Sequence, residues 1–209
     1  MNRNLGQLAG ALTLLIATYY GMLRIAEGKC EAAIGAAGVS LQPSQVDDFA
    51  AFVRLRSHLH ELGQTAFSDR LDQLRQRDAL FVAPALGPER WAAYVEALGL
   101  VKRIYIRRQA LRDPIGHLYA KTGPGNTPPD FQSAFARLSL AGALRHELAH
   151  YEGAIEESAA YREELAWYDE VRKSPFVAGL DEGARAAWDW AFESAILSAQ
   201  KAAKEAAAS

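Results

Sequence analysis

Residues 144–157 read Leu-Arg-His-Glu-Leu-Ala-His-Tyr-Glu-Gly-Ala-Ile-Glu-Glu and contain the pattern His-Glu-x-x-His. Residues four apart lie on one face of a helix, so His146 and His150 can direct two imidazoles at one metal ion. Glu147 lies one position further round and can reach a water bound to that metal. Zinc in a catalytic site takes three protein ligands and keeps one position for water, which a carboxylate can deprotonate. The pattern therefore predicts a zinc-dependent hydrolytic site.

The segment before the motif predicts the helix that carries it. Apolar residues recur at helical spacing from Phe131 to Leu148, and Asp130 with the Pro pair before it is typical of a helix start. The competing interpretation is a solvated helix face that carries His, Glu and His by coincidence. We favour the metal site because the motif falls at the C-terminal end of this patterned helix.

The motif resembles the active-site helix of the zincin metallopeptidases, and the resemblance covers about a quarter of the chain. It implies zinc bound by His146 and His150, with Glu147 as general base. It also implies a mostly helical α+β domain with a small sheet, which we assign to residues 43–204. In zincins an edge strand upstream of the metal helix pairs with extended substrate, and the stretch at 100–107 lies in the right place for that role.

Two glutamates compete for the position of third ligand. A continuous helix would place residue 157 about 10 Å beyond His150 along the axis, so the chain must turn, and Gly153 tolerates the left-handed conformation that ends helices. The spacing His-Glu-x-x-His-x-x-Gly-x-x-Glu resembles that of the metzincins and points to Glu156. Residues 157–161, Glu-Ser-Ala-Ala-Tyr, resemble the Glu-x-x-Ala-Asp/Tyr segment of gluzincin-like families and point to Glu157.

We favour Glu157 because its pattern spans more residues. The chain departs from both groups, since it has no metzincin third His and its loop between the motifs is much shorter than in thermolysin-like enzymes. Glutamates are also favoured in the first turn of a helix by the helix dipole, and this explanation accounts for at least one of Glu156 and Glu157.

The composition indicates one domain with a sizeable core. The chain has 209 residues, half of them hydrophobic, and a formal net charge of −2, which gives no indication of a nucleic-acid partner. The single cysteine, Cys30, excludes an internal disulfide and any Cys-rich zinc site.

An apolar stretch precedes the domain. Leu5 to Leu23 contains no charged residue and has the length of a membrane span, so we predict an uncleaved hydrophobic helix over residues 1–28 that can anchor the protein. Arg3 on one side and Arg24 on the other specify its orientation poorly, and we favour a domain outside the cytoplasm. Because polar residues and glycines interrupt the stretch, the alternative is a helix buried in a soluble domain.

The remaining patterns predict further helices and short strands. We expect helices at about 44–62, 68–78, 91–98, 154–173 and 182–204, and strands at 79–84, 100–107 and 114–120. Ser44 and Asp181 are expected helix caps. On the third strand His117 and Tyr119 would share a face, where either can stabilise an oxyanion or have a structural role. Residues 122–129 read as a loop at the cleft rim.

These observations favour a zinc metallopeptidase that cleaves a peptide or amide bond in a protein, a short peptide or peptidoglycan. The competing class is a non-catalytic, membrane-tethered helical scaffold or binding module with a structural or vestigial zinc site.

Overall fold

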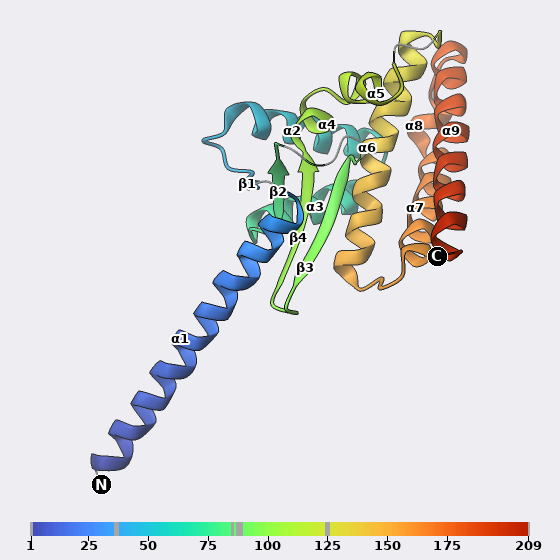
Figure 1. Ribbon diagram of the computed structural model, residues 1–209. Helices are drawn as coiled ribbons and strands as arrows, with labels where there is room; N and C mark the ends of the chain where they lie inside the picture. Colours follow the sequence, from blue (N-terminus) through green and yellow to red (C-terminus); the bar gives the residue numbers. More distant parts are fainter. Residues whose placement is uncertain (1, 36–37, 85, 87–89, 124–125, 209) are drawn as a thin grey trace.

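The computed structural model describes residues 2–35, 38–84, 86, 90–123 and 126–208, and side chains from residue 11 onward. This part of the chain is mostly helical and contains a small four-stranded mixed sheet (Figure 1). The predicted class, α+β with mostly helix, is confirmed. The helices are α1 Asn2–Ala33, α2 Val46–Glu61, α3 Thr65–Gln76, α4 Arg108–Arg112, α5 Pro114–Thr122, α6 Pro129–Glu152, α7 Glu157–Arg172, α8 Pro175–Ala178 and α9 Glu182–Ala207. The strands are β1 Val39–Ser40, β2 Leu80–Ala83, β3 Ala92–Ala97 and β4 Val101–Arg107.

The sheet has the strand order β1-β2-β4-β3, so β3 forms one edge. β2 and β4 are parallel, whereas β1 with β2 and β3 with β4 are antiparallel. Alternate side chains enter two cores: Leu80 and Ile104 pack into the main helical core, and Phe81 and Tyr105 pack on the opposite face with the end of α1. Because both faces are covered, β2 is apolar throughout and the middle of β4, Ile104 to Ile106, is apolar and buried.

Helix α6 lies at the centre of the helical layer. It contacts α5, α7, α9 and the sheet, and Figure 1 shows it side by side with α9. Leu138, Leu144 and Leu148 of α6 are buried in the main core. The helix predicted from residue 131 to residue 151 is confirmed, and its core-facing residues leave the motif on the side toward β3 and α7.

The predicted helix over residues 91–98 is wrong, because this segment is strand β3. Leu98 and Gly99 adopt positive φ angles of 56° and 64°, as is typical of tight hairpin turns, and Leu100 N–H donates to Ala97 O at 3.0 Å. Pro88 with Glu89 before the segment and Gly99 after it are typical of a helix start and a helix end, and they had favoured a helix here. Gly99 is instead part of this turn, and Pro88 and Glu89 lie outside the described residues.

The predicted strand over residues 114–120 is also wrong, because it forms α5. Asp113 caps this helix, since its side chain accepts the Gly116 N–H at 2.9 Å, and Pro114 occupies the first turn. His117 and Tyr119 therefore lie on a helix, and their expected shared strand face does not form.

Other elements agree with the sequence to within a few residues. The strands at 79–84 and 100–107 and the helices near 44–62, 68–78 and 182–204 are confirmed, whereas the helix expected from residue 154 begins at Glu157. Asp181 caps α9 by accepting the Ala184 N–H at 2.8 Å, but the cap position of α2 is Gln45 rather than Ser44. Residues 124–125 of the predicted loop lie outside the described residues.

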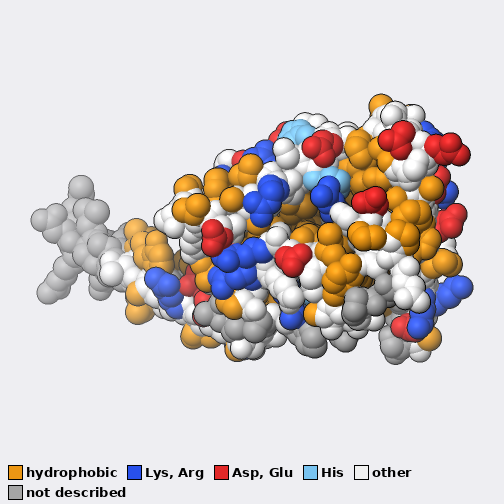
Figure 2. All heavy atoms as spheres, turned by 90° about the horizontal axis from the view of Figure 1, so that it is seen from above, with side chains coloured by type: hydrophobic (Ala, Val, Ile, Leu, Met, Phe, Trp, Pro, Cys, Tyr) orange, Lys and Arg blue, Asp and Glu red, His pale blue; other side chains and the backbone are white. Residues whose placement is uncertain are grey.

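Helix α1 is longer than the predicted 1–28 segment and has two parts. Its C-terminal end packs on the sheet through Ala26 and Cys30, and Glu27 pairs with Arg103 at 3.2 Å. The preceding part projects from the body with its apolar side chains exposed (Figure 2). The alternative, a helix buried in a soluble domain, is therefore wrong for residues 11–22, whose side chains are exposed. The side chains of Arg3 and residues 5–10 are not among those that the structure describes.

Helices in the described part of the chain do not combine the length and apolarity that crossing a bilayer requires. This finding does not support the expectation that α1 spans a membrane.

Candidate metal centre

The two motif histidines and one glutamate meet where α6 ends and α7 begins. His146 and His150 lie on the last two turns of α6, and Glu157 is the first residue of α7. Gly153, with a φ of 121°, ends α6, and the Ala154 N–H donates back to Ala149 O at 2.9 Å. This turn returns the start of α7 to the motif face of α6, as the position of Gly153 predicted.

The donor atoms of these residues lie close together. His146 Nε2 is 3.1 Å from Glu157 Oε2 and 3.2 Å from His150 Nε2, and His150 Nε2 is 3.5 Å from the same carboxylate oxygen. Ligand atoms held about 2.0–2.1 Å from zinc in a tetrahedron lie about 3.3 Å apart. The spacing and the chemistry, two imidazole nitrogens and one carboxylate oxygen, therefore fit a zinc ion.

Of the two competing glutamates, only Glu157 belongs to this group among the described residues. Glu156 precedes α7 as its cap residue, and its carboxylate accepts the Ser158 hydroxyl at 3.3 Å. The geometry therefore favours Glu157 over Glu156 as the third donor.

The second nitrogen of each histidine faces an oxygen. His150 Nδ1 donates to Ala154 O at 2.7 Å, which leaves the Nε2 lone pair free to bind a metal. His146 Nδ1 lies 3.4 Å from Glu164 Oε2, an ion-pair distance. Glu164 is buried and accepts the Tyr168 hydroxyl at 2.8 Å. A Cβ at Gly142 would overlap this hydroxyl, so glycine permits Tyr168 to approach α6.

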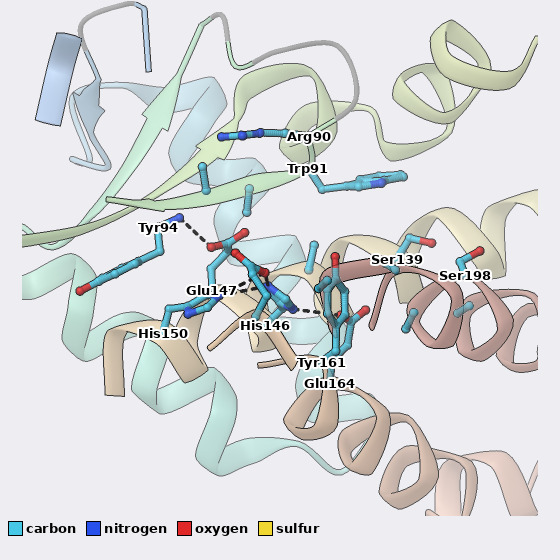
Figure 3. Close-up of a pocket in the computed structure, with 18 of the residues that line it drawn as sticks. Arg90, Trp91, Tyr94, Ser139, His146, Glu147, His150, Tyr161, Glu164 and Ser198 are labelled. Carbon is cyan, nitrogen blue, oxygen red and sulfur yellow. Dashed lines mark hydrogen bonds and ion pairs between the residues drawn. The ribbon is translucent and has the colours of Figure 1, made fainter. Parts of the chain in front are cut away.

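Glu147 lies next to the donor group and faces strand β3. Its Oε2 accepts the Tyr94 backbone N–H at 2.7 Å (Figure 3). Burial raises the pKa of Glu147 above its ordinary value, against the opposing influence of His146 and the Tyr94 N–H. A carboxylate with a raised pKa is a stronger base than an ordinary one, which suits it to accept a proton.

All these groups open onto one cleft of about 1160 Å³, formed by β3, α5, α6, α7 and α9. Tyr161 of α7 lines it, with its ring centroid 4.3 Å from that of His146. From the sequence, Tyr161 was only the last residue of the segment 157–161 and had no role in the site. Its position four residues after Glu157, on the same helix face, is the signal that could have identified it. Burial raises the pKa of Tyr161, so its hydroxyl stays protonated.

Neither expected oxyanion residue belongs to the described lining of this cleft. His117 is buried, with its ring centroid 4.4 Å from that of Trp91, and Tyr119 lies on α5 outside the lining.

The strand beside the cleft is β3, not the stretch at 100–107, which forms the internal strand β4. Arg107 N–H donates to Trp91 O at 3.0 Å, so alternate residues from 91 onward bond to β4. The backbone groups of Ala92, Tyr94 and Glu96 therefore face outward along the edge. The edge strand near the motif is therefore β3, and the expectation that residues 100–107 have this position is wrong.

No protein-family model, curated protein or solved structure matches this chain. The interpretation of the site therefore depends on its residues and their geometry.

Proposed function

We propose that the chain is a zinc-dependent hydrolase of peptide or amide bonds. The observation that carries this proposal is the group formed by His146, His150 and Glu157, whose donor atoms lie within 4.8 Å of one another, beside the half-buried Glu147 in an open cleft. A set of three protein donors is typical of catalytic zinc, whereas structural zinc takes four. The resemblance of the motif to that of the zincins supports the same assignment.

In this proposal each residue of the site has its own chemical role. A zinc ion held by His146, His150 and Glu157 would lower the pKa of a bound water and polarise the substrate carbonyl. Glu147 accepts the proton of the attacking water and gives it to the leaving amine. Tyr161, packed on His146, supplies a hydroxyl that can donate to the oxygen that becomes negatively charged.

The edge of β3 supports an extended peptide as the substrate class. The outward backbone groups of Ala92, Tyr94 and Glu96 lie beside Glu147, and an added strand would hydrogen-bond to them. Glu147 occupies the Tyr94 N–H, so a substrate strand would pair with the neighbouring groups. Proteins, short peptides and peptidoglycan cross-links all remain within this class.

Zinc content and hydrolysis together test the proposal. Purified protein should hold one zinc per chain and cleave an unstructured protein such as casein. Glu147→Gln should keep the zinc and lose at least about 10²-fold in rate, because the proton acceptor is gone. Glu157→Ala should lose the zinc, whereas the matched control Glu156→Ala should keep both zinc and activity.

Two outcomes would contradict the proposal. Full activity of Glu147→Gln would exclude the mechanism. Zinc that is present without hydrolysis, and whose removal unfolds the protein, would favour the scaffold or binding module with a structural site.

A further inference from the structure

A second pocket lies between α2, α6 and the junction of α4 with α5, apart from the metal centre. Its volume is about 410 Å³, and none of its described lining residues also lines the cleft. Helix α2 contributes Arg54 and His58, four residues apart on one face, and α6 contributes Arg137. We call it the α2–α6 pocket; its apolar lining comes from Ala51, Leu55, Leu111, Pro114, Ile115 and Leu140.

His58 lines this pocket, and neither of its ring nitrogens has a hydrogen-bond partner among the described residues. The residue is only 9 % exposed. Its Nδ1 lies 3.5 Å from Glu61 Oε2, an ion-pair distance that is longer than an ordinary hydrogen bond. Buried polar groups are almost always hydrogen-bonded, because an unsatisfied one destabilises the fold. A ligand oxygen in the pocket would give the ring N–H of His58 an acceptor.

The arginines of the lining give it an excess of positive charge. Arg112 is already bound by a carboxylate of α2 at 2.6 Å, whereas no ion pair joins Arg54 or Arg137 to another described residue. Of the two acidic lining residues, Asp113 is engaged as the cap of α5, and Glu61 is exposed to solvent. With three arginines and two carboxylates, the lining matches a ligand with a single negative charge.

We propose that the α2–α6 pocket binds a small organic carboxylate with an apolar tail. Guanidinium groups bind a carboxylate through paired hydrogen bonds, so Arg54 and Arg137 hold the head group, and His58 donates a further bond. The tail packs against the leucines of the lining. A volume of about 410 Å³ and an apolar wall with few polar groups are typical of small-molecule sites.

Three ligands that differ in one feature each test this site. Hexanoate, its uncharged counterpart hexanamide, and acetate, which lacks the tail, are titrated into the isotope-labelled full chain, with NMR chemical shifts as the readout of place and affinity. Wild type should bind hexanoate at least about tenfold more tightly than hexanamide, because hydrogen bonds between charged groups are the stronger ones. Acetate should bind at least about tenfold more weakly than hexanoate, since it buries no chain of methylene groups.

Variants of the lining test where the carboxylate binds. Arg54→Gln and Arg137→Gln each remove a guanidinium at an exposed position, so the fold should persist and the hexanoate affinity should fall about tenfold. His58→Phe keeps an aromatic ring beside Trp188 but removes the hydrogen bond, and should weaken hexanoate binding severalfold. Arg162→Gln is the matched control, because it makes the same charge change at an exposed position of α7 outside the lining.

Three results would overturn the proposal. Equal affinities of wild type for hexanoate and hexanamide, including no binding of either, would exclude a carboxylate site. Chemical-shift changes confined to the cleft around His146 would place the binding elsewhere, and so would a hexanoate affinity that survives both arginine variants. The arginine variants decide the outcome if His58→Phe does not fold. None of these measurements depends on zinc or hydrolysis, so the pocket and the hydrolase stand or fall separately.

Discussion

At the scale of single residues, the candidate site depends on the groups that orient each donor. His150 is held by the Ala154 carbonyl, and His146 faces the buried carboxylate of Glu164, which Tyr168 in turn bonds. Hydrogen bonding at the second nitrogen fixes the tautomer and orientation of a ligating imidazole and raises its basicity. Burial lowers the pKa of His146, but Glu164 and the other nearby carboxylates outweigh burial and raise it overall.

Removal of the Glu164 carboxylate should weaken zinc binding. Glu164→Ala is expected to lower the affinity by about 10–100-fold, because His146 loses the partner of its Nδ1. Competition titration with a chelator measures this affinity. Glu164→Gln keeps an acceptor oxygen and should recover part of the loss.

The neighbouring Glu163→Ala serves as control, since the exposed Glu163 pairs with Arg145 at 2.7 Å. Equal zinc affinity in wild type and all three variants would show that Glu164 does not position His146.

At the scale of elements, one end of helix α1 is buried against the sheet and the rest is exposed to solvent. Ala26 and Cys30 are buried against the sheet, whereas the apolar side chains from Leu12 to Met22 are exposed. Exposed apolar surface of this extent marks an interaction site, and a membrane surface remains our proposal for it. An extracytoplasmic domain stays a prediction.

Deletion of residues 1–20 should separate membrane binding from folding. The free energy of unfolding should stay within about 0.5 kcal/mol of wild type, because the described side chains removed are exposed. The full chain should float with vesicles of phosphatidylcholine and phosphatidylglycerol, and the shortened chain should not.

Deletion through residue 33 is the contrasting variant. It also removes Ala26 and Cys30 from their core, so it should lower the free energy of unfolding by at least about 2 kcal/mol. A full-length protein that stays in the vesicle-free fraction would contradict membrane association.

At the scale of the whole molecule, helices α2 and α9 contribute to the main core, and a buried histidine remote from the site lies between them. His58 of α2 is buried, with its ring centroid 5.8 Å from that of Trp188 on α9. Burial and the positive charge of Arg137 on α6 lower the pKa of His58, although Glu61 opposes them. The fold therefore holds this imidazole neutral between three helices.

Acidification should lower the free energy of unfolding because His58 becomes protonated more readily in the unfolded chain. A lowered folded pKa means that the unfolded chain binds the proton first, so stability present above about pH 6.5 is lost as the pH falls. Urea unfolding from about pH 7 to about pH 5 should show a steeper loss in wild type than in His58→Gln, by up to about 1.4 kcal/mol per pH unit.

The comparison with His58→Gln isolates this group from His146, whose raised pKa acts in the opposite direction. His60→Gln removes an exposed imidazole from the same helix and should keep the wild-type slope. Parallel slopes in wild type and His58→Gln would show that His58 does not resist protonation.

The sequence alone determined the features that depend on local chemistry. Helical periodicity and the Pro-Asp start specified α6, the i, i+4 spacing placed His146 and His150 on one face, and Gly153 predicted the turn that ends the helix. These signals are local because hydrogen bonds within a helix join residues only four apart.

Tertiary structure decided everything that depends on partners distant in the sequence. Residues 91–98 form a strand because β4 pairs with them, and β3 rather than β4 becomes the edge beside the motif. Glu157 rather than Glu156 lies near the two histidines because the first residue of α7 packs against the end of α6. Tyr161 and Glu164 reach His146 by the same packing, which no single-segment pattern encodes because helix packing sums contacts from several elements.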